Sequence, residues 1–192
     1  MAHQQQFNYI QQLKLRYPTH FFNKKVLEVG SLNINGSIRI FFTECDYLGI
    51  DVGTGPDVDL VCEGQKLTHP DETYDTVGSC ECFEHNPYWV ETFNNMYRMT
   101  KQKGLVFMSC ATTGRPEHGT TRTSPADSPL TIGKGWDYYK NLTEQDFRDT
   151  LIWMICLVVI TSMLVLHIQT YTSTVLKKQI LQFKEDVEND RC

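Results

Sequence analysis

The sequence has no cluster of basic residues, and its 18 Lys and Arg are outnumbered by 23 Asp and Glu, for a formal net charge of −5. A protein that binds nucleic acid through its phosphates needs a basic patch, so we expect no nucleic-acid partner. The sequence also has no internal repeats and no low-complexity tract. Its 192 residues are enough to bury the core of one domain.

Residues 1–16 lack the apolar stretch of a signal peptide, and the seven cysteines lack the spacing of a disulfide framework. Both features indicate reduced thiols inside a cell. We therefore expect a cytoplasmic protein. A charge-free stretch after Thr150 leaves a single-pass membrane protein as the alternative.

Short apolar runs alternate with stretches of helical spacing along the first 110 residues. This alternation predicts βαβ units and an α/β fold with a mostly parallel sheet. The expected strands are 25–29, 47–51, 58–61, 74–79 and 105–109, and the expected helices are 7–17, 37–42, 89–99 and 141–148.

The first expected strand ends in Gly30, where a glycine lets the backbone turn sharply beneath a ligand. The small polar residues of 31–36 leave backbone amides free at a helix start. Asp51 ends the second strand 21 residues later, where a carboxylate can accept hydrogen bonds from a ribose diol. Leu32 breaks the three-glycine pattern of dinucleotide sites. These residues alone therefore leave a plain strand-to-helix turn and a solvated Asp as the alternative.

Five motifs follow one another at fitting distances, namely 27–31, 47–51, 57–64, 74–77 with Glu84-His85 after it, and 103–107. Together they resemble the class I S-adenosylmethionine-dependent methyltransferases of the type 11 group, over about residues 24–147. The resemblance implies a Rossmann-like fold and S-adenosylmethionine as the cofactor. It also implies methyl transfer by in-line displacement to a small-molecule or glycan-type acceptor.

The same resemblance implies a cofactor site at the ends of the first four strands. Glu28 and Gly30 would line the methionine side, Asp51 would bind the ribose hydroxyls, and Glu63 with Gly64 would lie near the adenine. The residues expected to bind the cofactor are Glu28, Gly30, Ser31, Asn35, Gly36, Asp51, Glu63, Gly64, Ser79, Cys80 and Glu81.

Two histidines are candidates for catalysis, because a base helps when the acceptor is a hydroxyl or a protonated amine. His85 follows the fourth strand, and His118 follows the fifth. Packing or helix capping is the alternative for His85, and an ordered surface loop is the alternative for His118. We expect Arg115, Glu117 and Trp136 to bind the acceptor.

Cys80, Cys82 and His85 form a C-x-C-x-x-H pattern. A structural zinc site needs four ligands, and no second pair occurs elsewhere, so we expect no metal. Cys110 at the end of the fifth strand remains a second choice as a nucleophile, without a partner visible in the sequence.

Two other functions stay open. A nicotinamide-dependent oxidoreductase would use the same turn and the same carboxylate, and a degenerate or membrane-tethered binding module would use them without catalysis. Methylation of nucleic-acid bases ranks lower, because the fourth strand is not followed by an Asn/Asp-Pro-Pro-aromatic signature.

We expect a methyltransferase domain over 1–150, made of an N-terminal helix (1–20), a cofactor-binding core (24–110) and an acceptor-side loop (111–140). An atypical tail follows over 151–192. Residues 151–168 are almost wholly apolar and reach the lower length limit of a transmembrane helix. The last two strands of the sheet are thus expected to be missing or replaced by an apolar helix.

A frameshift near Thr150 is a second interpretation of this tail. In another reading frame, the codons for 153–156 force a (Leu/Met)-Asp-Asp-(Met/Leu) run. The codons for 169–178 permit a string that looks like the closing strand of the same methyltransferases. We favour this hypothesis over a true membrane anchor, and the nucleotide sequence tests it.

Overall fold

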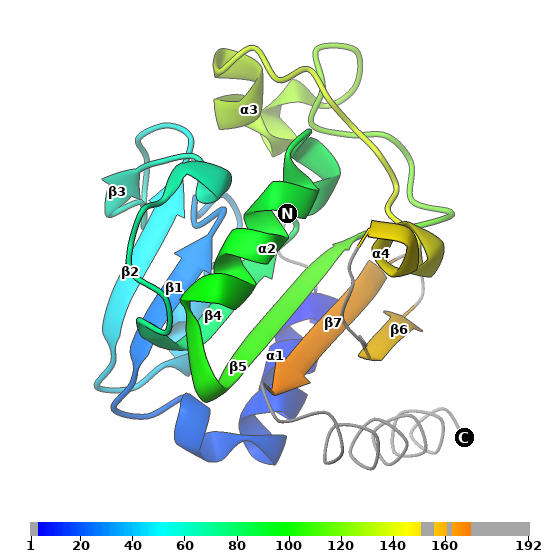
Figure 1. Ribbon diagram of the computed structural model, residues 1–192. Coiled ribbons are helices and arrows are strands. Elements are labelled where there is room, and N and C mark those ends of the chain that lie inside the picture. Colours follow the sequence, from blue (N-terminus) through cyan, green and yellow to red (C-terminus); the bar gives the residue numbers. More distant parts are fainter. Residues whose placement is uncertain (1–3, 151–155, 161–162, 170–192) are drawn as a thin grey trace.

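The computed structural model describes residues 4–150, 156–160 and 163–169, and Figure 1 shows a central sheet with helices on both faces. The strands are β1 (Lys25–Val29), β2 (Asp46–Asp51), β3 (Leu60–Val61), β4 (Tyr74–Cys80), β5 (Thr100–Ala111), β6 (Cys156–Ile160) and β7 (Met163–Gln169). The α-helices are α1 (Gln4–Arg16), α2 (Trp89–Met99), α3 (Pro129–Gly133) and α4 (Glu144–Thr150).

The strands form one sheet of order β3-β2-β1-β4-β5-β7-β6. Strands β1 to β5 run parallel to their neighbours, whereas β7 pairs antiparallel with both β5 and β6. The chain order reverses between β1 and β4, which is where the sheet of a doubly wound fold opens a crevice for ligands. The predicted Rossmann-like α/β fold with a mostly parallel sheet is confirmed.

Strand β5 shows why the central strands have continuous apolar sequences. Leu105 and Phe107 pack on the side of α1, and Val106 and Met108 pack on the side of α2. All four are fully buried, because successive side chains of a strand point to opposite faces and both faces carry helices. Figure 1 shows α2 in front of the sheet and α1 behind it.

The end of the sheet corrects one prediction. Residues 156–160 and 163–169 are strands that complete the sheet beside β5, so the last two strands are neither missing nor replaced by an apolar helix. The run Leu157-Val158-Val159-Ile160 is rich in β-branched residues, which favour strands. Pairing with β7 also satisfies the backbone edge of β5, which a helix would have left open.

No helix within the described parts of the chain has both the length and the apolar character needed to cross a membrane. Of the expected apolar segment 151–168, residues 151–155 and 161–162 lie outside the described residues. The frameshift hypothesis also draws on residues 170–178, which lie outside them as well.

Two further elements differ from their predicted form. The expected helix at 37–42 is a single 3-10 turn, Ile38–Phe41, capped by Ser37, whose Oγ accepts from the backbone N–H of Arg39. By Phe42 the backbone is extended again. Strand β5 begins at Thr100, directly after α2, rather than at Leu105. Lys103 has a left-handed φ of 62° inside this strand.

Candidate functional site

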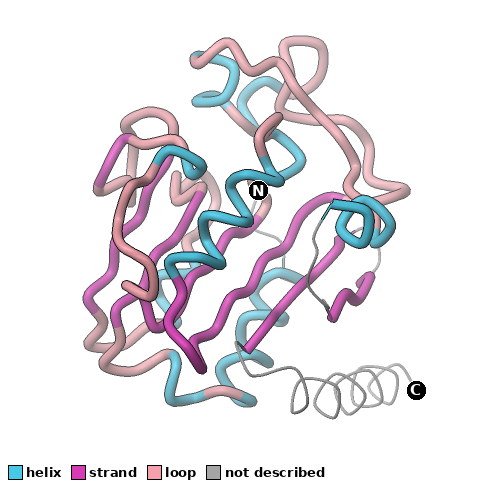
Figure 2. Tube along the Cα trace, viewed as in Figure 1, coloured by secondary structure: helices cyan, strands magenta, loops and turns pink. Residues whose placement is uncertain are grey.

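A cleft opens at the carboxyl ends of β1, β2 and β4. The empty space inside it, including the part open to solvent, is about 690 Å³. Figure 2 shows that long loop segments, drawn in pink, gather at this end of the sheet, and Figure 1 shows α3 lying above it. The predicted site residues that line this cleft are Glu28, Gly30, Ser31, Asn35, Gly36, Asp51, Cys80, Glu81 and His85.

Asp51 presents a carboxylate whose orientation is fixed by the backbone. The N–H of Leu32 donates to its Oδ2 over 3.0 Å, and the N–H of Val52 donates to its Oδ1 over 2.7 Å. Burial raises the pKa of Asp51, and these two amides oppose the rise. Each carboxylate oxygen keeps a further lone pair, so the group can accept hydrogen bonds from a vicinal diol in the cleft.

Gly30 forms the turn beneath this carboxylate. Its φ is +81°, and a Cβ built on it would lie 2.6 Å from both Cβ and Sγ of Cys82. The next residue, Ser31, is buried in the cleft wall, and its Oγ has no hydrogen-bond partner among the described residues. The backbone N–H groups of Gly30 and Ser31 both donate to the backbone oxygen of Ile50. Within the described chain, the group that this turn leaves without a partner is therefore the hydroxyl of Ser31.

Gly30→Ala should destabilise the protein more than Gly135→Ala, although Gly135 has a similar φ of +85°. No atom of the described residues lies within 4 Å of the Cβ position at Gly135, so that variant incurs only the cost of the left-handed backbone, about 1 kcal/mol. Gly30→Ala adds the overlap with Cys82, which we expect to cost about 1 to 2 kcal/mol more. Urea unfolding of both variants measures the difference, and equal losses would contradict the close contact.

Glu28 lies at the floor of the cleft and is 5% exposed. Burial raises its pKa to about 7, although the hydroxyl of Tyr47 donates to its Oε2 over 2.7 Å and opposes the rise. Burial of Glu28 therefore costs little free energy when its carboxyl group is protonated and more when that group is charged. A cation on the ligand would favour its charged form.

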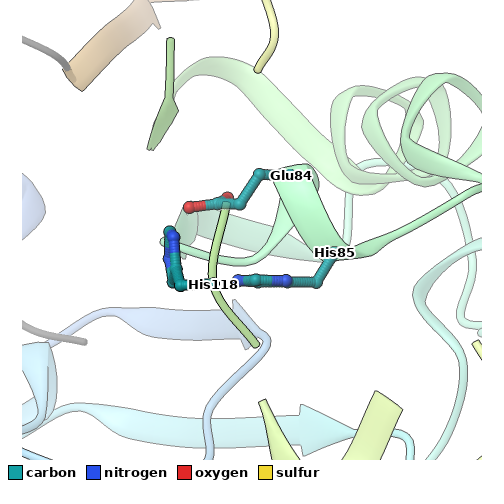
Figure 3. Close-up of side chains that lie close together, drawn as sticks. All are labelled: Glu84, His85 and His118. Atoms are coloured by element: carbon teal, nitrogen blue, oxygen red, sulfur yellow. The ribbon is translucent and has the colours of Figure 1, made fainter. Parts of the chain in front are cut away.

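Glu84, His85 and His118 meet beside the cleft, and Figure 3 shows their side chains converging from two separate segments. Glu84 and His85 lie in the 3-10 turn Phe83–His85. Just before this turn, Glu81 has a left-handed backbone conformation with φ of 50°. The rings of His85 and His118 have centroids 5.0 Å apart at 86°. Such backbone strain after a strand end is typical of functional sites.

The charges of this cluster are strongly affected by its surroundings. Burial, and after it the neighbouring His118, lower the pKa of His85 to about 3. Burial also lowers the pKa of His118. Burial and then the charge of Glu81 raise the pKa of Glu84 to about 8. Both imidazoles are therefore neutral at pH 7 and keep a lone pair.

Three predicted cofactor residues have other partners near the cleft. The Ser79 hydroxyl donates to the backbone oxygen of Val29 over 2.8 Å. Glu63 forms ion pairs with Lys66 and Lys134 at 2.9 and 3.0 Å. Gly64 is buried against α2, and its backbone oxygen accepts from Asn95 over 2.8 Å. Their roles in cofactor binding stay predictions.

The three predicted acceptor residues also lie outside the cleft wall. Glu117 is paired with Arg122 at 3.0 Å, and the Trp136 ring lies 5.4 Å from that of Tyr88. The backbone oxygen of Arg115 accepts from Asn141. Their binding of an acceptor stays a prediction.

Sequence reasoning missed several cleft residues. Residues Asp127 to Thr131 line the cleft and belong to the predicted acceptor-side loop, 111–140. The sequence predicted that loop but not which of its residues line the cleft. Gln6 is buried in the same wall, with its Oε1 unpartnered among the described residues. A signal for it existed, since Gln6 shares the helical face of Ile10 and Leu13. The other residues missed are Leu32, Ile34, Ser37, Ile38 and Cys82.

Comparisons with known proteins agree with this fold. Residues 45–108 match the family described as "Methyltransferase domain". No curated protein matches the chain. A Burkholderia thailandensis 1,6-didemethyltoxoflavin N1-methyltransferase, solved with 1,6-didemethyltoxoflavin and S-adenosylhomocysteine, is similar with TM-score 0.52 and 12% identity over 90% of this chain and 92% of that one. An S-adenosylmethionine-dependent methyltransferase from Aquifex aeolicus is similar with TM-score 0.51 and 13% identity over 85% and 98%. At such identities the likeness shows the fold alone.

Proposed function

We propose that this chain, a class I methyltransferase by its fold and by the methyltransferase domain over residues 45–108, transfers a methyl group from S-adenosylmethionine to a small-molecule or glycan-type acceptor. The observation that carries the proposal is the Asp51 carboxylate. It lines the cleft at the strand-order reversal, held by the amides of Leu32 and Val52, directly beside the Gly30 turn.

The residues present fit this cofactor. Asp51 would hold the ribose hydroxyls, and Glu28 with Gly30 would line the methionine side, where the α-ammonium group favours a charged carboxylate. The unpartnered Oγ of Ser31, counted within the described chain, is a further polar atom that a ligand would satisfy. When bound, S-adenosylmethionine supplies an electrophilic methyl group: an acceptor lone pair bonds to its carbon, and the carbon–sulfur electron pair leaves with the sulfur.

The chain's own residues then have to orient the acceptor, exclude water and handle its proton. The segment from Asp127 to Thr131 walls the cleft from above, and His85 lines it from the side. We assign the acceptor end of the cleft to His85 and to His118 behind it. The small-molecule class is supported by the Burkholderia methyltransferase, whose structure contains 1,6-didemethyltoxoflavin.

Calorimetric titration of the full chain with S-adenosylhomocysteine and, separately, with NAD tests the cofactor. We expect saturable binding of S-adenosylhomocysteine with one site per chain and no binding of NAD at the same concentrations. Binding of NAD alone would replace the methyltransferase with an oxidoreductase, and binding of neither would favour a degenerate module. A screen for S-adenosylhomocysteine release in the presence of hydroxyl and amine acceptors then identifies the acceptor class.

A further inference from the structure

The cluster of Glu84, His85 and His118 contains three buried polar atoms without a hydrogen-bond partner in the described chain, namely Glu84 Oε2, His85 Nδ1 and His118 Nε2. The three residues are only 0%, 3% and 7% exposed. An unsatisfied buried polar group costs about 1 to 3 kcal/mol, so three in one place indicate a missing partner.

The geometry of the cluster suits a cation. One ligand atom from each residue lies within 4.8 Å of the others. Metal bonds of about 2.1 Å in tetrahedral arrangement place two ligand atoms about 3 to 4 Å apart, which small side-chain rotations reach. Figure 3 shows the Glu84 carboxylate and the two rings turned toward one common space.

The second contacts of His118 and Glu84 are those expected of metal ligands. His118 Nδ1 lies 3.1 Å from the backbone oxygen of Pro116, which can only accept, so Nδ1 carries the proton and Nε2 presents its lone pair. Glu84 Oε1 accepts from the backbone N–H of Ala111 over 3.1 Å, which leaves Oε2 for a second partner. Both side chains are thus held by the backbone at the atom that a metal would not use.

We propose that Glu84, His85 and His118 form a binding site for one divalent transition-metal ion. Two imidazoles and one carboxylate are typical ligands of Zn²⁺, Co²⁺, Mn²⁺ and Fe²⁺, whereas Mg²⁺ and Ca²⁺ prefer oxygen. Three protein ligands leave a coordination position open, as in catalytic metal sites. Because His85 lines the cleft, that position is close to the space assigned to the acceptor.

This proposal departs from the sequence-based expectation of no metal, which considered only Cys80, Cys82 and His85. The ligands come instead from the 3-10 turn after β4 and from the loop after β5. Metal binding does not depend on the proposed function; only its use, to hold an acceptor oxygen, rests on it. A nitrogen that binds a metal ion cannot also accept the acceptor's proton, so the two roles of these histidines exclude each other.

Titration of the metal-free full chain with Co²⁺, followed by visible absorption, tests the site. We expect one ion per chain and a spectrum without the thiolate-to-cobalt band, which separates this cluster from the seven cysteines. Glu84→Gln keeps an oxygen for Ala111 and His118→Asn keeps a donor for Pro116, and each should weaken Co²⁺ binding at least about tenfold. His69→Gln, a histidine that instead contacts Tyr74, should bind as wild type does.

The same samples are titrated with S-adenosylhomocysteine, whose predicted site includes neither Glu84 nor His118. Unchanged affinity shows that the variants are folded. Absence of a bound ion in wild type, a thiolate spectrum, or variants that bind Co²⁺ as tightly as wild type would each overturn the metal site and leave the proposed function standing. If wild type binds one Co²⁺ ion but does not bind S-adenosylhomocysteine, the proposed function is overturned instead.

Discussion

Asp51→Asn should weaken the binding of S-adenosylhomocysteine about 100-fold. Two hydrogen bonds from ribose hydroxyls to a charged acceptor contribute about 1.5 kcal/mol each, and their combined loss corresponds to that factor. The asparagine keeps the size of the side chain but has one accepting oxygen, for which the amides of Leu32 and Val52 compete with the ligand. The affinity is measured by calorimetry at pH 8, because burial raises the pKa of Asp51 and the wild-type group has to be charged.

Asp46→Asn provides the matched control. Asp46 begins the same strand at its opposite end, and it is exposed and distant from the cleft wall. We expect its affinity for S-adenosylhomocysteine to equal that of wild type. Similar affinities for the two variants would mean that Asp51 does not hold the ribose.

Glu28→Gln should stabilise the ligand-free protein by about 3 kcal/mol at pH 8 and leave it nearly unchanged at pH 4. The folded chain holds the Glu28 proton up to about pH 7, whereas the unfolded chain releases it near its ordinary value of 4.5. The folded state therefore binds more protons between these values. The protonated Glu28 contributes its full share to the free energy of unfolding below pH 4.5. This contribution, about 3 kcal/mol, is lost as the pH rises to about 7.

Urea unfolding of wild type and Glu28→Gln from pH 4 to pH 8 measures this effect as a difference between two curves. The difference removes the contributions of Glu84, His85 and His118, which titrate in both proteins. Glu91→Gln, an exposed site on α2, controls for the substitution itself. A difference that does not grow with pH would show that Glu28 is not held protonated by its surroundings.

The same variant links stability to binding. If Glu28 lines the methionine side of the cofactor, removing its charge weakens S-adenosylhomocysteine while it stabilises the free protein. Such opposite effects are expected where a buried acid is kept for function at the expense of stability.

The central strands and α2 were predictable from local pattern because burial on both faces makes parallel strands continuous apolar runs. Helix α2 matches its predicted range of 89–99, and its Trp89, Phe93 and Met96 are buried as their spacing requires. A local capping pair likewise begins α4: Thr143 Oγ1 accepts from the Asp146 N–H, and Asp146 accepts from the Thr143 N–H. Short-range chemistry of this kind can be predicted from sequence alone.

The tail and the site were less predictable for the same physical reason. A charge-free run such as 156–160 suits a buried strand and an apolar helix equally, and the free edge of β5 decides between them. The positions of Glu28 and Asp51 in the site could be predicted because both residues lie in strands near their carboxyl ends. The meeting of His118 with Glu84 depends on the path of the loop after β5, which no local pattern specifies.

The most direct measurement is an experimental structure of the full chain with S-adenosylhomocysteine bound. We expect the nucleoside to lie in the cleft between the Gly30 turn and α3, with both ribose hydroxyls within about 3.2 Å of the Asp51 carboxylate. A nucleoside bound elsewhere, or a ribose without contact to Asp51, would contradict the account.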